Sequence, residues 1–294
     1  MLRLLVGILS RLPLSVLYFI VDTLLFPVLY HLVRYRRKIV RMNLRNSFPE
    51  WSKKQLKQTE RKFYRHFCDI IVEIIYGYRC PAEEMNRRVR FFRLEQMAQL
   101  AIKHKGCIMS VGHLGNWEWT AQVGCMLRPY GVQSVHIYRR LKNTDVNRLM
   151  LDIRSRRESD FTEMKQTLRK VMSQFHNDIP TAYGMVADQK PSPKQKEYLW
   201  LDFLRQDTPF VQGVEKIACK FNYPVIYGYT RCIRRGYYEI DIILITDRPQ
   251  EEPEGYITRR YAELLEENIR EQPDLWLWSH NRWKYKRKQE TIKP

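Results

Sequence analysis

Short apolar runs alternate with amphipathic segments from residue 107 onward. The apolar runs have the length and the β-branched and aromatic content of buried strands, and they cover residues 107–111, 132–138, 182–187, 224–230 and 237–245. Among and after them, apolar residues recur at helical spacing near 116–128, 143–157, 161–176, 209–222 and 255–271. Strands that alternate with helices predict an α/β fold, with a mainly parallel central sheet flanked by helices.

Two local signals indicate where helices begin in this region. Asp160 and Glu163 have the spacing of an acidic capping box. Thr208 followed by Pro209 has the form of an N-cap with proline at the first helical position. We therefore expect helices to start near residues 160 and 208.

The most apolar stretch of the chain runs from Leu12 to Val33. As a helix it is about 33 Å long, enough to cross a bilayer. Asp22 near its middle costs roughly 2.5–3.5 kcal/mol on insertion scales, and Pro13 and Pro27 interrupt its backbone hydrogen bonds. A tilted, kinked or half-inserted anchor is therefore as good an expectation as a clean span, and a buried core helix is the alternative.

A strongly basic block follows this apolar stretch directly. The chain has 51 Lys and Arg residues against 32 Asp and Glu, a formal net charge of +19. Twelve basic and only two acidic residues lie between Arg34 and Arg65. A basic block beside an apolar segment favours an anionic membrane over nucleic acid as the partner, and it places the rest of the chain on the cytoplasmic face. Many of these charges alternatively solvate one face of an amphipathic helix.

These patterns divide the chain into three expected parts. Residues 1–33 form a membrane anchor, residues 34–80 a basic helical linker, and residues 81–294 the catalytic domain. The linker helix is expected to break at Phe48-Pro49, with Asn46 and Ser52 as caps. The six cysteines are scattered without a C-x-x-C pair, so we expect free thiols and no structural metal.

The densest chemical signal is the segment GHLGNWE at 112–118, between a predicted strand and a predicted helix. Ligands of α/β folds bind at the carboxyl ends of strands. If the two glycines allow a tight turn after His113, Glu118 in the first helical turn can reach one nitrogen of the imidazole ring and leave the other free to remove a proton. The alternative is a structural histidine, with Glu118 acting as a favourable acid at a helix start.

This segment resembles the H-x4-[DE] motif of the bacterial lipid A late acyltransferases, of the lauroyltransferase type, within the wider lysophospholipid acyltransferase-like group. The resemblance extends over most of the chain. It includes RYRRKIVRMNLRNSFPE after the apolar stretch, IYRRLKN at 137–143, RSR at 154–156, VADQK at 186–190, DFLRQDTPFVQGVEKIA at 202–218 and WLWSHNRWK at 276–284.

The resemblance implies a set of site residues. It places the catalytic histidine at His113, its acidic partner at Glu118, a functional arginine at Arg154 and a later aspartate at Asp188. Arg139, Asn116 and Gly115 are implied as substrate-binding residues. On local pattern alone, Arg154 is equally a surface helix residue and Asp188 a helix or turn cap. The chain departs from many members at Phe203-Leu204-Arg205 and after Asp188, which bears on substrate or chain length.

The implied activity is transfer of a fatty acyl chain from an acyl thioester, with acyl carrier protein as the expected donor, to a hydroxyl of a lipid A precursor at the inner membrane. His113 acts as general base with Glu118 as its orienting partner. Amides at 114–118 serve the oxyanion, and Arg154 holds a phosphate or stabilises charge. No metal or cofactor is expected. The alternatives are acylation of a glycerophospholipid or aminolipid, coenzyme A as donor, or a non-catalytic polybasic protein that binds membranes or nucleic acid.

Overall fold

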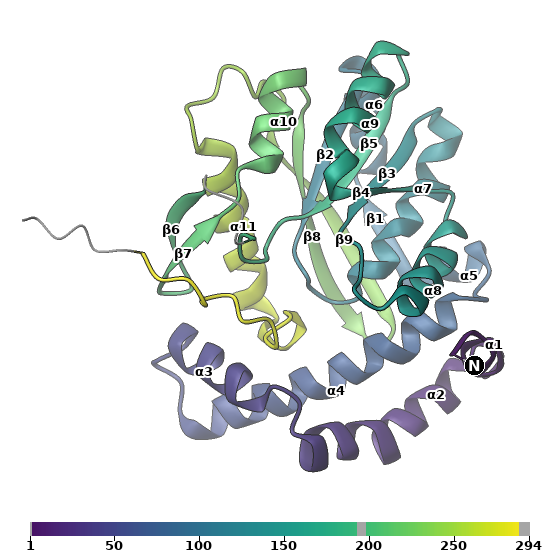
Figure 1. Cartoon of the computed structure of the whole chain (residues 1–294), viewed down its shortest axis with the longest axis vertical. Coiled ribbons are helices and arrows are strands. Elements are labelled where there is room, and N and C mark those ends of the chain that lie inside the picture. The colour runs from purple at the N-terminus through teal and green to yellow at the C-terminus, as the bar shows by residue number, and fades with distance from the viewer. Residues whose placement is uncertain (1, 193–197, 288–294) are drawn as a thin grey trace, which may run out of the picture.

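The computed structural model describes residues 2–192 and 198–287 and confirms the α/β class, with a mostly parallel central sheet between helices (Figure 1). The sheet has seven strands in the order β1-β9-β8-β2-β5-β3-β4. Five of them, from β8 to β4, run in one direction, whereas β9 is antiparallel to β8 and pairs in parallel with β1. The strands are β1 Val89–Phe92, β2 Gly106–Val111, β3 Gln133–Tyr138, β4 Asp160–Glu163, β5 Thr181–Val186, β8 Val225–Arg234 and β9 Tyr237–Thr246.

Helices cover both faces of the sheet because its central strands are apolar on both sides. Cys107, Met109 and Val111 of β2 pack on one face with helices α6 and α7, whereas Ile108 joins the cluster on the other face with α9, α10 and α11. The α-helices after residue 81 are α5 Ala82–Arg88, α6 Leu94–Lys103, α7 Val123–Leu127, α8 Thr144–Ser155, α9 Thr167–His176, α10 Gly213–Phe221 and α11 Tyr256–Glu271.

Two helical starts predicted from local spacing are wrong. Asp160–Glu163 forms the edge strand β4, paired with β3, rather than a capping box. Thr208 and Pro209 lie in β7 (Gln206–Phe210), which forms a two-stranded hairpin with β6 (Leu199–Phe203). In both places pairing with a neighbouring strand outweighs the local preference for a helix start. The helix expected from about 209 begins at Gly213 instead.

A 25-residue helix, α4 (Lys53–Gly77), crosses the carboxyl ends of the parallel strands (Figure 1). It begins in a capping box between Ser52 and Gln55, which confirms Ser52 as a cap. The preceding helix α3 (Arg37–Ser47) ends just before Phe48-Pro49, where the break was predicted. The region expected as a linker therefore forms one wall of the folded body.

The N-terminal apolar segment lies along α4 (Figure 1). It consists of α1 (Leu2–Leu9), α2 (Leu14–Ile20) and two π-helical stretches, Val21–Leu25 and Val28–Val33. Leu14–Val33 is long and apolar enough to cross a membrane, and 22% of its most apolar window is buried inside the protein. Its buried side belongs to the same hydrophobic cluster as α4 and the sheet.

Candidate active site

His113 and Asp188 meet at the carboxyl ends of two neighbouring strands. In the pairing of β2 with β5, Val111 lies opposite Val186, and each functional residue follows its valine by two positions. The His113 ring places Nδ1 2.5 Å from Oδ1 of Asp188, and the His113 amide donates to Oδ2 at 2.8 Å. The parallel register of the sheet thus brings together two residues that are 75 positions apart in the chain.

Asp188 is held as a buried carboxylate. Its side chain is 2% exposed, and the indole Nε1 of Trp276 also donates to Oδ2, at 2.7 Å. Although burial alone raises the pKa of a carboxyl group, the charge and hydrogen bonds of His113, together with that of Trp276, lower the pKa of Asp188 to about 2. The carboxylate is therefore ionised at neutral pH and accepts the Nδ1 proton of the ring.

The opposite nitrogen of His113 is the one available for chemistry. With the Nδ1 proton directed to Asp188, Nε2 carries a lone pair, and the side-chain amide of Gln189 lies 3.1 Å from it. The ring of Trp117 lies edge-on to the imidazole at 5.0 Å between centroids. The His113 side chain is 15% exposed, so a small part of it is open to solvent.

Glu118 does not contact His113, and this corrects the expected pairing. Both Glu118 oxygens accept hydrogen bonds from Arg154, at 2.7 Å from Nε and 2.7 Å from Nη2. Asp188 occupies the place beside the His113 ring that was expected for Glu118. The end of strand β2 directs the His113 ring toward β5, whereas the 3-10 helix Trp117–Gln122 directs Glu118 toward α8.

Glu118 and Arg154 form a mostly buried bidentate pair, with side chains 14% and 15% exposed. The Arg154 guanidinium also lies 5.6 Å from the ring centres of Tyr138 and Phe161. The pair lines a cavity of about 50 Å³, whose other walls come from the 3-10 helix that starts at Trp117, from β2, β3 and β5, and from Phe161. Arg154 is therefore not an ordinary surface residue of its helix.

Gly115 and Asn116 lie in the turn between His113 and Glu118 and fix its conformation. Gly115 has φ +56°, and a Cβ there is 3.0 Å from the Tyr238 ring, so only glycine fits. Its amide donates to the Leu275 carbonyl at 3.2 Å and is not free for an oxyanion. Asn116 is 3% exposed and accepts from the Trp119 amide. A direct role of these two residues in substrate binding stays a prediction.

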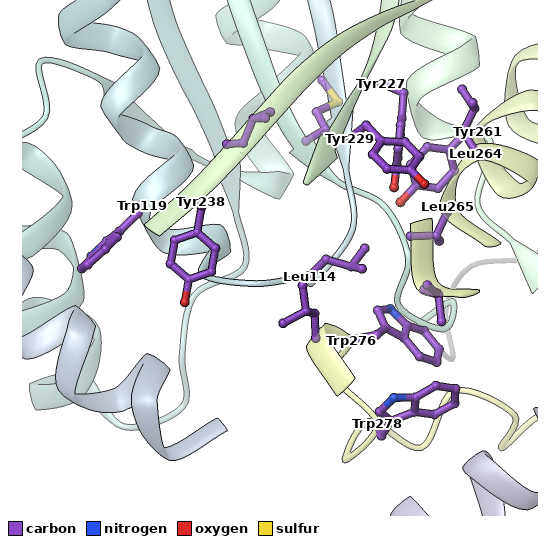
Figure 2. Close-up of a cluster of buried hydrophobic side chains, with 14 of the residues drawn as sticks. Leu114, Trp119, Tyr227, Tyr229, Tyr238, Tyr261, Leu264, Leu265, Trp276 and Trp278 are labelled. Atoms are coloured by element: carbon purple, nitrogen blue, oxygen red, sulfur yellow. The ribbon is translucent and has the colours of Figure 1, made fainter. Parts of the chain in front are cut away.

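The C-terminal segment closes this turn from the other side. Leu114 forms a β-bridge with Trp276, and the Leu277 amide donates to the His113 carbonyl at 3.1 Å. Figure 2 shows Leu114 between Tyr238 on one side and Trp276 on the other. Trp276 therefore contacts both segments of the dyad, because its backbone bridges Leu114 beside His113 and its indole donates to Asp188.

Three basic side chains lie close enough to Lys190, two residues after Asp188, to influence its ammonium group. The pKa of the Lys190 ammonium is lowered by partial burial and by the charges of Lys284, Arg36 and Arg139. Lys190 follows Gln189, and its amide donates to the His280 ring at 3.3 Å. None of the four forms an ion pair with a carboxylate of the residues described here. We call Arg36, Arg139, Lys190 and Lys284 the basic cluster.

Sequence reasoning missed several residues that shape this site. Gln189 and Trp276 lay within recognised segments but received no role, because nothing in the local pattern shows that they face His113. The same holds for Glu73, which contacts the turn from α4. All six cysteines are free thiols, and the described residues contain no cluster of histidine, cysteine and carboxylate side chains suited to a metal.

Comparison with known proteins gives a match over nearly the whole chain. Residues 3–285 match a family model described as bacterial lipid A biosynthesis acyltransferase. Among curated proteins, none matches the chain. The matched range contains the dyad, the Glu118–Arg154 pair and the basic cluster, so all of the geometry above lies within the family region.

Proposed function

The chain belongs to the bacterial lipid A biosynthesis acyltransferase family, and from that membership we propose that it transfers a fatty acyl chain from an acyl carrier protein thioester to a hydroxyl of a lipid A precursor. Its membership in the family implies an acyltransferase. The observation that carries the finer proposal is the His113–Asp188 dyad, in which Asp188 takes Nδ1 and the Gln189 side-chain amide lies beside Nε2. A free alcohol is a poor nucleophile at neutral pH, and this arrangement supplies the base that it needs.

In the proposed reaction, the acceptor hydroxyl takes the place of the Gln189 amide at Nε2 of His113. As the hydroxyl oxygen bonds to the thioester carbonyl carbon, its proton passes to Nε2, and the charge of Asp188 stabilises the imidazolium. The tetrahedral intermediate collapses when the carbon–sulfur bond breaks. The thiolate leaves with the proton that His113 returns, so the ring ends in its starting state.

Glu118 and Arg154 are proposed to support this reaction without acting as the base pair. Their bidentate contact joins the helix that starts at Trp117 to α8, beside the cavity next to the turn. Because two nitrogens of Arg154 already serve Glu118, a phosphate-binding role fits the basic cluster better. We therefore assign the acceptor phosphate to Arg36, Arg139, Lys190 and Lys284, which have no carboxylate partner among the described residues.

The proposed setting is the cytoplasmic face of the inner membrane. The N-terminal segment exposes large apolar side chains, among them Phe19 at 67% and Leu32 at 75%. The basic block from Arg34 follows directly and attracts anionic lipid. The net charge of +19 also favours an acidic donor protein.

The test is acyl transfer by the purified full chain, followed by mass spectrometry of the lipid product. The donors are a long-chain acyl carrier protein and acyl coenzyme A, and the acceptors are a lipid A precursor, a lysophospholipid and an aminolipid. We expect transfer to the lipid A precursor from acyl carrier protein, with His113→Ala at least about 100-fold slower, the lower range for a positioned general base. The exposed His176→Ala variant is the matched control.

A second arm of this experiment tests the basic cluster. Arg139→Ala is expected to raise the KM for the phosphorylated acceptor about 10-fold, the effect of roughly one lost charge-assisted contact. Arg140→Ala, the neighbouring exposed arginine, is the control and keeps the parent KM. If Arg139→Ala and Arg140→Ala have the same KM, the basic cluster is not the phosphate site. If the chain acylates only one of the other acceptors, that acceptor replaces the lipid A precursor in the proposal. If no acyl transfer is seen with any donor, the enzymatic proposal is wrong.

A further inference from the structure

Glu73 is a fully buried carboxyl group just over one turn before the end of α4, with no exposed side-chain surface. Three donors from three separate segments converge on it. The hydroxyl of Tyr18 donates to Oε1 at 2.7 Å, and the amide of Asn116 and the hydroxyl of Tyr238 donate to Oε2 at 2.9 and 2.8 Å. Burying a carboxyl group is costly unless such partners surround it, so their convergence is a built feature of the fold.

One arm of this group reaches the catalytic turn. Asn116 lies between His113 and Glu118, and while its amide nitrogen donates to Glu73, its oxygen accepts from the Trp119 backbone. The Trp119 indole in turn donates to the Glu73 carbonyl at 3.2 Å. The start of the helix that carries Glu118 is thus fixed on α4 by two hydrogen bonds that Glu73 accepts, one with its side chain and one with its backbone carbonyl.

The other arm reaches the N-terminal apolar segment. Tyr18 lies in α2, and one turn further Asp22 pairs with Arg235 at 2.7 Å. Arg235 also donates to Asp69 at 2.8 Å, one turn before Glu73 on α4. These polar contacts bond the N-terminal segment to α4 and to the β8–β9 turn, and the segment also packs along α4 (Figure 1).

We propose that Glu73 is a positioning residue that couples the docked N-terminal segment to the catalytic turn, through Tyr18 on one side and Asn116 on the other. This inference rests on the proposed acyl transfer. The segment then has a second task besides attachment to a lipid surface, because its docking sets the position of the residues that follow His113. Loss of the link slows turnover even when the substrates are dispersed in detergent and no membrane is needed.

The experiment measures kcat and KM of the full chain in detergent for Glu73→Ala, Glu73→Gln and Tyr18→Phe. Tyr64→Phe is the matched control, because this buried α4 tyrosine donates to the Tyr35 carbonyl and so also ties α4 to the N-terminal region, but without reaching the turn. We expect kcat about 10-fold or more lower in Glu73→Ala, at unchanged donor KM, since displacements of about 1 Å at a site have effects of this size. Glu73→Gln keeps the shape, and three hydrogen bonds remain when its amide nitrogen donates to the Tyr18 hydroxyl and its oxygen still accepts from Asn116 and Tyr238. We therefore expect it to retain most of the parent rate, with Tyr18→Phe falling between.

A second readout does not depend on activity. Modification of His113 by diethyl pyrocarbonate, mapped by mass spectrometry, is expected to speed up in Glu73→Ala and Tyr18→Phe but not in Tyr64→Phe. A folded Glu73→Ala chain with parent kcat and parent His113 reactivity overturns the inference. Equal losses in Tyr18→Phe and Tyr64→Phe do so as well, because they show general destabilisation. A parent that transfers no acyl group while its His113 reactivity responds as expected contradicts the proposed function and leaves the coupling in place.

Discussion

At the scale of single residues, Asp188 shows how a buried charge is made favourable. The carboxylate has almost no contact with solvent, yet it accepts from the His113 amide, the His113 ring and the Trp276 indole. These partners outweigh the cost of burial and bring its pKa to about 2. The negative charge is therefore in place before an imidazolium forms, as general base catalysis by His113 requires.

Replacing Asp188 by Asn is expected to lower kcat by about 100-fold to 10,000-fold, because the amide keeps the shape but neither fixes the ring tautomer nor stabilises the imidazolium. The effect does not add to that of His113→Ala, since the two side chains act as one unit. Steady-state kinetics of both single variants and the double variant measure this. Asp178→Asn, at an exposed aspartate, is the control. A kcat for Asp188→Asn within about 10-fold of the parent contradicts the dyad.

The same variant has a defined dependence on pH. The pKa of Asp188 is lowered in the fold from its ordinary value of 3.8 to about 2, so its ionised form contributes stability above about pH 4, and this is lost as the pH falls toward 2. The difference in the free energy of unfolding between the parent and Asp188→Asn should therefore shrink from pH 5 to pH 2.5 in urea titrations. A difference that stays constant shows that the charge of Asp188 is not stabilised in the fold.

At the scale of elements, α8 is bound to the start of the 3-10 helix Trp117–Gln122 through Arg154 and Glu118. The planar guanidinium places two donors on one carboxylate, which fixes the direction between the two elements as well as their distance. The contact lies beside the aromatic rings of Tyr138 and Phe161 and is mostly shielded from water. Because the pair lines the cavity next to the turn, we expect its loss to change the shape of that cavity.

Arg154→Lys is accordingly expected to lower kcat/KM about 10-fold or more although the charge is kept, because an ammonium group cannot replace the bidentate fork. Glu118→Gln should have a similar effect, and the double variant should be less than additive, since the residues act through one contact. Arg148→Lys, at an exposed arginine of the same helix, is the control. If Arg154→Lys has the same kinetics as the parent, the Glu118–Arg154 pair has no influence on the site.

The elements also show what the sequence can and cannot reveal. Periodicity predicts the central strands and the amphipathic helices because each is set by burial against one sheet. It misassigns Asp160–Glu163 and Thr208-Pro209, because those segments take their conformation from β3 and β6 rather than from their own residues. The site follows the same rule. His113 and Glu118 are visible as a motif, but the partner of each comes from a distant strand or helix and depends on the register of the sheet.

At the scale of the whole molecule, the N-terminal segment is bonded to the body along its length. Val6 of α1 is buried against Leu149 and Ile153 of α8, and Asp22 further along pairs with Arg235. The start and the middle of the segment therefore contact the same folded body, and Tyr30 near its end packs on Tyr64 of α4. A helix that crossed the bilayer with this body on one side would have to break the contacts of α1. We therefore expect the docked segment to lie in one leaflet, with its exposed apolar face toward the acyl chains.

This arrangement is tested by the sidedness of two single cysteines, Arg3→Cys and Lys38→Cys, in a background where the partly exposed Cys125, Cys219 and Cys232 are serine. A segment that lies in one leaflet leaves both positions on the same face of the membrane. An impermeant maleimide added to sealed inverted vesicles should then label both, and the same reagent added to intact cells should label neither. Labelling of Arg3→Cys from outside the cell shows instead that the segment spans the bilayer. In that case α1 leaves α8, and because the contact of Tyr18 with Glu73 is formed in the docked state, Tyr18→Phe would no longer lower the rate of the membrane-bound enzyme.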